Sequence, residues 1–170
     1  MKSLFRCTVC GAPLTREEKT YRCPNGHSFD IAKEGYTYLL PVNQRHSKAP
    51  GDDKAMTAAR SAFLAKGYYS FLQAALCELA VRYAPEDPTL LDVGCGEGYY
   101  TAAVCDTLAA AGKPPRGAGI DISKDMARRA AKRAKQAEIA VASAYHLPLG
   151  DETVDLLLDC FSPLSAEEFR

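Results

Sequence analysis

The sequence predicts an α/β fold built around a doubly wound parallel sheet, with a small separate unit at the N-terminus. From residue 89 onward, short apolar runs alternate with segments of helical periodicity. This alternation is typical of a parallel sheet with helices on both faces. A glycine-rich turn joins the first of these strands to a helix, and four cysteine and histidine residues mark the N-terminal unit. A chain of 170 residues has the length of one domain with a small addition.

The N-terminal unit carries the pattern C-x2-C-x12-C-x3-H, formed by Cys7, Cys10, Cys23 and His27. Each half of the pattern is a short turn that can aim two ligands at one point, and four such ligands complete a tetrahedral zinc shell. A segment this short buries too little surface to fold alone, so one Zn²⁺ per chain would stabilise it. Four protein ligands leave no position for water, which indicates a structural ion. The alternative is four unrelated residues, including buried free cysteines.

The next segments lead from this unit to the sheet. Residues 36–40 read as a short strand of the ribbon, and residues 44–53 as a polar loop, which either touches phosphate through its basic residues or is merely solvated. Helical periodicity covers residues 54–66 and 70–84, and in the second helix Leu72, Leu76, Leu79 and Tyr83 share one face. The predicted domains are therefore a zinc-binding unit over 1–45, a linker and helical pair over 46–88, and a ligand-binding domain over 89–170.

The glycine-rich turn separates a predicted strand over 89–94 from a helix over about 99–111. Glycine at positions 94, 96 and 98 permits backbone conformations closed to other residues and leaves no Cβ in the way of a ligand. The free amide groups at the start of the helix carry partial positive charge and favour an anion. The spacing G-x-G-x-G is one residue tighter than the dinucleotide fingerprint. A plain tight turn is the alternative.

A second acidic residue follows the next predicted strand, over 117–122. Asp121 lies about 20 residues beyond the glycine turn, where a doubly wound fold places an acid that binds ribose hydroxyls. Ser123 is a candidate N-cap for a helix over 123–136. Strands over 138–143 and 154–159 complete the alternation. A solvated turn aspartate is the alternative for Asp121.

Composition limits the function further. No apolar run is long enough to span a membrane, and the N-terminus has no signal-peptide core. Seven cysteines without an export signal argue against a disulfide framework, so we expect a cytoplasmic protein. Residues 1–60 hold ten Lys/Arg against six Asp/Glu, and residues 61–170 hold eleven against fifteen. This basic front half suggests a polyanionic partner, although random scatter could produce the excess.

Several of these segments occur together, in one order. They are the zinc pattern, Lys33-Glu34-Gly35-Tyr36 with Leu39-Leu40-Pro41, Pro50-Gly51-Asp52, Gly67-Tyr68-Tyr69, and the run DVGCGEGYYT from Asp92 to Thr101. This combination resembles the bacterial 23S ribosomal RNA guanine-N1 methyltransferases of the RlmA type. The resemblance covers essentially the whole chain, and the zinc pattern joined to the glycine turn makes it specific.

The resemblance implies a Rossmann-like class I methyltransferase sheet with a small N-terminal zinc ribbon. It also implies zinc at the four residues of the pattern, S-adenosyl-L-methionine as cofactor, and an RNA hairpin recognised by the N-terminal domain. Asp121 would bind the cofactor ribose. The cofactor-binding residues would be Tyr69, Asp92, Gly94, Gly96, Glu97, Gly98, Tyr99, Tyr100, Thr101 and Asp121.

Two features depart from the wider class. Many relatives place an acidic residue after the third strand to contact adenine, and here Ser143 or Tyr145 stands in that region. The class fold also continues through three more strands, so the sheet is expected to be incomplete at its C-terminal end. We therefore expect either a fragment or a short relative, with the strand over 154–159 as an open edge.

The catalytic candidates follow the fourth strand, where the target base would enter. Guanine N1 bears a proton at neutral pH, and Asp159 is the candidate acceptor, with Phe161 as a stacking surface. The alternative is that Asp159 caps the strand and Phe161 packs in the core. Two other functions stay open: a non-catalytic zinc and RNA-binding fragment, and a methyltransferase for a small molecule. A homodimer is also left open.

Overall fold

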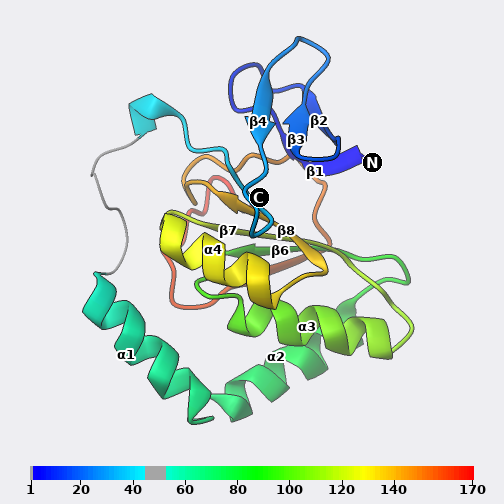
Figure 1. The fold of residues 1–170 in the computed structure, drawn as a ribbon. Helices are drawn as coiled ribbons and strands as arrows, with labels where there is room; N and C mark the ends of the chain where they lie inside the picture. Colours follow the sequence, from blue (N-terminus) through cyan, green and yellow to red (C-terminus); the bar gives the residue numbers. More distant parts are fainter. Residues whose placement is uncertain (1, 45–52) are drawn as a thin grey trace.

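The computed structural model describes residues 2–44 and 53–170, which form two sheets and four α-helices. The N-terminal sheet is antiparallel, in the order β1-β2-β3-β4. It stands above the rest of the molecule in Figure 1. Its strands are β1 (Lys2–Arg6), β2 (Pro13–Arg16), β3 (Thr20–Arg22) and β4 (Ser28–Asp30).

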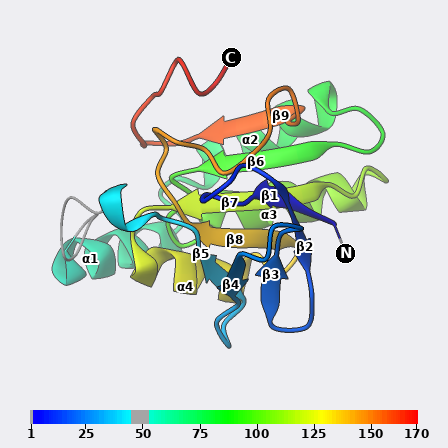
Figure 2. The same ribbon diagram turned by 90° about the horizontal axis from the view of Figure 1, so that it is seen from above.

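The second sheet is parallel, in the order β5-β8-β7-β6-β9. Its strands are β5 (Tyr36–Tyr38), β6 (Thr89–Val93), β7 (Arg116–Asp121), β8 (Ala137–Val141) and β9 (Leu156–Asp159). The alternation predicted from residue 89 onward is confirmed, with strand ends within about two residues of those expected. Because all five strands run in the same direction, their carboxyl ends lie along one edge of the sheet (Figure 2).

The assignment of residues 36–40 to the ribbon is wrong. β5 pairs in parallel with β8, with Tyr36 opposite Ile139 and Tyr38 opposite Val141. Tyr36 and Thr37 are buried there, so a short run of apolar and β-branched residues gains more from the edge of a large sheet than from a small ribbon. The bounds of the three predicted domains stay predictions.

The helices are α1 (Lys54–Ala65), α2 (Ser70–Tyr83), α3 (Tyr99–Ala110) and α4 (Lys124–Arg133), and a 3₁₀ turn covers Val42–Gln44. Asp53 caps α1 by accepting the Met56 N–H at 2.8 Å. The polar loop expected over 44–53 and the motif at residues 50–52 lie largely outside the described residues. None of the described helices is long and apolar enough to cross a membrane.

The packed face of α2 differs from the expected one. Ala80 and Ala84 are buried in a cluster with Leu76, whereas Leu79 and Tyr83 are exposed. Small alanine side chains let the helix approach the sheet closely. Leu79 and Tyr83, each one position before a buried alanine, therefore face the solvent.

In the described part of the chain, helices pack on one face of the parallel sheet and the zinc ribbon covers the other. Alternate residues of β6 show this: Leu90 packs with α2 and α3, whereas Leu91 and Val93 pack with Phe5 and Leu14 of the ribbon. The expectation of helices on both faces is corrected accordingly. Because both faces of the sheet are buried, the sequences of these strands are continuously apolar.

A buried carboxylate fixes the ribbon on the sheet. Glu138 of β8 accepts hydrogen bonds from Ser3 Oγ at 2.6 Å, Tyr21 Oη at 2.8 Å and the Leu4 N–H at 3.0 Å. Three donors satisfy a group that would be costly to bury alone. The N-terminal sheet is therefore packed into the core of the molecule.

Candidate functional site

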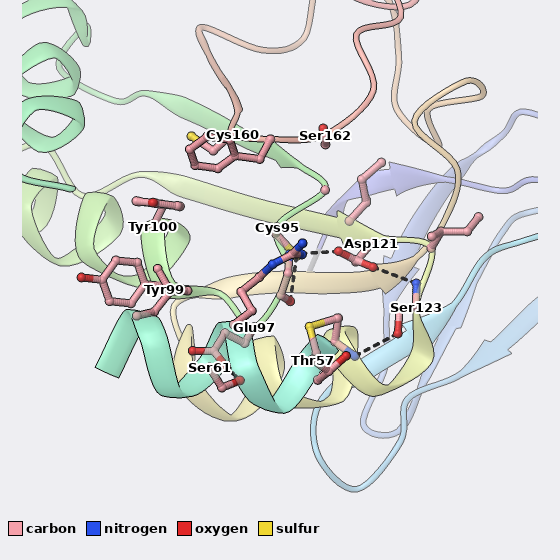
Figure 3. A pocket seen from close by; sticks show the side chains of 18 of the residues that line it. Thr57, Ser61, Cys95, Glu97, Tyr99, Tyr100, Asp121, Ser123, Cys160 and Ser162 are labelled. Atoms are coloured by element: carbon pink, nitrogen blue, oxygen red, sulfur yellow. Dashed lines mark hydrogen bonds between the residues drawn. The ribbon is translucent and has the colours of Figure 1, made fainter. Parts of the chain in front are cut away.

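A cavity of about 710 Å³ opens at the carboxyl ends of the parallel strands. Its walls come from α1, from the segments that follow β6, β7, β8 and β9, and from the start of α3 (Figure 3). The ends of parallel strands are where open α/β sheets bind ligands. The size lies within the usual range for small-molecule sites.

The glycine turn forms one wall of this cavity. All three of its glycines have positive φ, between +55° and +75°. A Cβ at Gly94 would lie 2.2 Å from the Ser162 Cβ, and one at Gly98 would lie 3.0 Å from the backbone of Ala130. Glycine is thus required both by the backbone conformation and by the close approach of two neighbouring segments.

Asp121 holds the turn at the cavity. One of its oxygens accepts the Gly96 N–H at 2.9 Å, and the other accepts the Ser123 N–H at 2.7 Å. Ser123 in turn caps α4 by accepting the Met126 N–H. These bonds fix the orientation of the Asp121 carboxylate at the wall of the cavity.

Asp92, Gly98 and Thr101 lie behind the turn, outside the cavity wall. Asp92 is 1% exposed and accepts the Thr101 hydroxyl at 2.5 Å. Burial, with smaller effects of the Asp121 and Asp159 carboxylates, raises the pKa of Asp92 to about 7. Asp92 thus stabilises the turn through its hydrogen bond with Thr101 and does not line the cavity.

An aromatic pair stands over the cavity. The rings of Tyr69 and Phe161 stack with centroids 5.6 Å apart, and both residues line the cavity. Phe161 is 73% exposed and has a φ of +63°. Such a conformation costs about 1–3 kcal/mol and is held where the surroundings demand it.

Asp159 lies just outside the cavity wall, at the end of β9. Its carboxylate accepts a hydrogen bond from the Ser162 hydroxyl, which also lies 3.0 Å from the Val93 carbonyl. Ser162 itself lines the cavity, so it stands between Asp159 and the cavity space. Cys160 follows β9 and lines the cavity too, and burial raises the pKa of its thiol to about 11.

Tyr99 and Tyr100 also line the cavity, at the start of α3. Tyr100 is 8% exposed, and its hydroxyl has no hydrogen-bond partner among the described residues. Burial raises the pKa of this hydroxyl to about 12, so it stays a donor. An unsatisfied buried hydroxyl beside a cavity is a candidate donor to a polar ligand.

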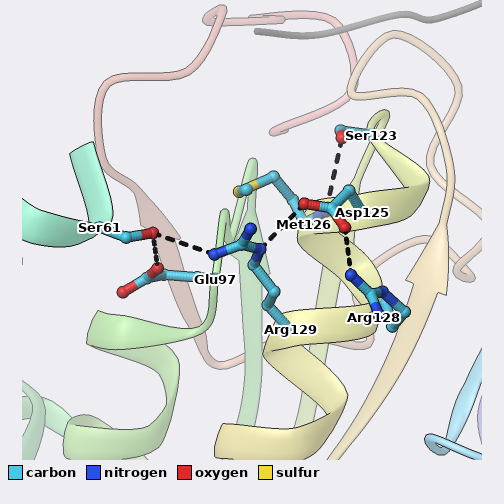
Figure 4. Close-up of polar contacts among 7 residues, drawn as sticks. All are labelled: Ser61, Glu97, Ser123, Asp125, Met126, Arg128 and Arg129. Atoms are coloured by element: carbon cyan, nitrogen blue, oxygen red, sulfur yellow. Dashed lines mark hydrogen bonds and ion pairs between the residues drawn. The ribbon is translucent and has the colours of Figure 1, made fainter. Parts of the chain in front are cut away.

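Glu97 joins three elements at the rim. It accepts hydrogen bonds from Ser61 of α1 and, at 2.5 Å, from Arg133 of α4. Arg129 lies 3.4 Å from the same Ser61 hydroxyl (Figure 4). The carboxylate of Glu97 thus fastens α1 over the cavity.

No role in the site was predicted for α1 from the sequence. Yet Thr57, Ser61 and Leu64 line the cavity, at spacings of four and three residues that put them on one helix face. That spacing was the available signal, although an amphipathic face alone does not identify its partner. Of the two candidates for the adenine contact, Tyr145 lines the cavity and Ser143 does not.

The zinc pattern is assembled in space. The ligand atoms of Cys7, Cys10, Cys23 and His27 lie within 4.8 Å of one another. The Cys10 and Cys23 sulfurs are 3.8 Å apart, and His27 Nδ1 lies 3.6 Å from Cys7 Sγ and 3.5 Å from Cys23 Sγ. A tetrahedron with zinc–sulfur bonds of about 2.3 Å and zinc–nitrogen bonds of about 2.05 Å has edges of about 3.8 and 3.5 Å. The four residues therefore fit the ion.

The surroundings of the cluster act in opposite directions on two of its thiols. The backbone N–H beyond Cys10 and the Asn25 side chain lower the pKa of Cys10 to about 6, whereas burial raises that of Cys7. Gly11 and Gly26, with φ of +72° and +85°, belong to the two turns that carry the ligand pairs Cys7 with Cys10 and Cys23 with His27. Such turns direct backbone N–H groups toward sulfur.

Comparison with known proteins gives the following matches. Residues 5–48 match the family described as the RlmA N-terminal zinc ribbon, and residues 90–169 match a methyltransferase domain. A 23S rRNA (guanine(748)-N(1))-methyltransferase of Streptomyces fradiae is 38% identical over 98% of this chain and 58% of its own length.

Two further relatives carry provisional names as 23S rRNA (guanine-N(1)-)-methyltransferases. The protein of Micromonospora griseorubida is 39% identical over 98% of this chain and 60% of its own length. YxjB of Bacillus subtilis is 34% identical over 99% of this chain and 60% of its own length. The chain thus spans about 60% of the length of the curated relatives it matches.

Proposed function

Since the chain belongs to the RlmA-type family, we propose that it serves S-adenosylmethionine-dependent methylation of guanine N1 in a hairpin of 23S ribosomal RNA. The observation that carries this proposal is the cavity at the strand ends, where the glycine turn, Asp121 and the unsatisfied Tyr100 hydroxyl converge. The names of the matched relatives support the substrate.

Different residues of the cavity would contact different parts of the cofactor. We assign the ribose hydroxyls to Asp121, which Gly96 and Ser123 already orient. The amide groups of the turn and the Tyr100 hydroxyl would meet the polar methionine end, and Tyr145 would flank the adenine. The remaining predicted contacts, Asp92, Gly98 and Thr101, would act by supporting the turn.

When bound, the cofactor supplies a methyl group on a sulfonium, which already has a good leaving group. The protein therefore mainly orients the target base and takes up the N1 proton. The exposed ring of Phe161 would stack on the base after leaving Tyr69. Asp159 would accept the proton through the Ser162 hydroxyl, which lines the cavity and donates to Asp159.

The zinc ribbon would bring the RNA to this cavity. With four protein ligands the ion has no chemical task of its own, and its role would be to stabilise the fold of the ribbon. With ribosomal RNA as substrate, the proposed reaction takes place in the cytoplasm. A homodimer stays a prediction that light scattering can test.

Transfer of a radiolabelled methyl group to 23S rRNA, followed by mapping of the modified base, tests the proposal. We expect label at N1 of one guanine. Asp159→Asn should lower the rate by about 10²–10⁴-fold, the usual contribution of a positioned base. Ser162→Ala should also slow transfer and leave binding of S-adenosylhomocysteine unchanged. A protein that binds neither the cofactor product nor RNA would refute the proposal.

A further inference from the structure

The exposed face of α4 is strongly basic. Its sequence KDMARRAAKR contains five basic residues and one acidic residue. The buried face consists of Met126, Ala127, Ala130 and Ala131, which pack against the sheet. The 3.6-residue period therefore places every basic side chain on the solvent side of this helix. A simply solvated helix face usually mixes both signs of charge.

Nearby carboxylates neutralise only part of this charge. Arg128 and Arg129 both bind Asp125, at 2.6 and 2.9 Å, and Arg133 binds Glu97. Glu34 also lies near enough to affect Arg128. Lys124 and Lys132 are exposed and form no ion pair with any described residue. The face therefore keeps a net positive charge beyond its internal pairs.

The basic face connects the two parts of the proposed RNA site. At one side, the loop leading from the ribbon to β5 packs over α4, with Ala32 against the alanine cluster. At the other side, Arg129 reaches Ser61 at the cavity rim (Figure 4). Arg133 binds Glu97 at the same rim. The basic face of α4 therefore lies between the loop that leaves the ribbon and the rim of the cavity.

A hollow of about 350 Å³ lies on this path. It is lined by Arg129, Lys132, Arg133 and Glu97. Glu97 is held by Arg133 and Ser61, which offsets its repulsion of an anion. Glu97 also lines the main cavity, so the hollow and the cavity share one wall.

We propose that the exposed face of α4 binds the phosphate backbone of the RNA substrate and that the hollow seats a phosphate next to the reacting nucleotide. This inference rests on the proposed function and adds a contact surface outside the zinc ribbon. It extends the expectation from net charge, which placed a polyanionic partner on the front half. Phosphate contacts of this kind position the RNA without reading its sequence.

The experiment measures binding of a fluorescein-labelled RNA stem–loop to the full chain by anisotropy, over a range of NaCl concentrations. The test variant is Lys124→Ala/Lys132→Ala, which keeps every ion pair of α4. The control is Arg82→Ala/Arg170→Ala, which removes the same formal charge from exposed residues and breaks only the exposed Arg82–Glu78 ion pair. The end of α2, which carries Arg82, packs near β9, at the opposite edge of the sheet from α4. Each phosphate contact contributes about 0.9 to the slope of log affinity against log salt.

If both lysines contact phosphate, the slope falls by about 1.8, and the affinity ratio of parent to test variant shrinks about 12-fold between about 50 and 200 mM salt. The control should match the parent. Equal binding by parent and test variant, equal losses in test and control variants, or no RNA binding by the parent would each overturn the inference. Binding of S-adenosylhomocysteine to the same proteins is measured in parallel by calorimetry. If the parent protein does not bind it, that result counts against the proposed function and not against RNA binding by α4.

Discussion

The substitution Asp92→Asn should change how the free energy of unfolding depends on pH. The difference in this free energy between the variant and the parent should move in favour of the variant as the pH rises. Asp92 lies in the centre of the sheet, 1% exposed, between β7 and β9. Asparagine has the same shape and can still accept the Thr101 hydroxyl, but it carries no charge. The comparison therefore isolates the ionisation of one buried carboxyl.

The magnitude follows from the pKa of Asp92, which burial raises from 3.8 to about 7. Because the folded-state pKa exceeds the unfolded one, the unfolded chain loses the proton first, and the free energy of unfolding falls as pH rises between these values. Above pH 7 the loss is complete. Between pH 5 and pH 8 the parent should lose about 3 kcal/mol through this group, and the asparagine variant none of it.

Urea unfolding of both proteins at pH 5, 6, 7 and 8, with zinc present, gives the difference in free energy of unfolding. Zinc ligands and other titrating groups are common to both proteins and cancel. The difference should move in favour of the variant by about 3 kcal/mol over this range. A difference that stays constant with pH, or one that moves the other way, would refute the argument that burial keeps Asp92 protonated.

Three further predictions follow. Protein purified without chelator should contain one zinc per chain by metal analysis, and a content near zero with freely reactive thiols would contradict the ribbon site. Asp121→Ala should weaken binding of S-adenosylhomocysteine by about 1–3 kcal/mol, the cost of unpaired hydrogen-bonding groups, and unchanged calorimetric affinity would remove Asp121 from the site. Replacing Arg6, Arg22 and Lys33 with alanine should weaken RNA binding and flatten its salt dependence while cofactor affinity stays the same. If this triple variant binds RNA as tightly as the parent at every salt concentration, the ribbon does not contact the phosphate backbone of the RNA.

Local signals in the sequence determined the helices, the central strands and the position of the glycine turn. Glycine at positions 94, 96 and 98 and an acid after the next strand require only neighbouring residues to be interpreted, because backbone freedom and helix capping act over a few positions. The zinc pattern is local for the same reason, since each pair of ligands lies on one turn. These features were predicted at the right residues.

Tertiary packing decided which elements meet. Tyr36–Tyr38 joins the parallel sheet because β8 offers it an edge about 100 residues further along the chain, and no local pattern encodes that partner. The ribbon takes a sheet face that was expected to carry helices, since Phe5 and Leu14 fit against Leu91 and Val93. Pairing and packing depend on residues distant in sequence, so period and propensity alone leave them open.

The charge of the second half shows the same limit. Summed over residues 61–170 it is acidic, and the sum hides a basic surface. Folding separates the charges. The alanines of α4 are buried, so its lysines and arginines lie on the exposed side of the helix. Glu97 is buried at the rim of the cavity. Composition determined how much charge this protein carries, whereas only the tertiary structure decided where that charge faces, because burial selects one side of each helix.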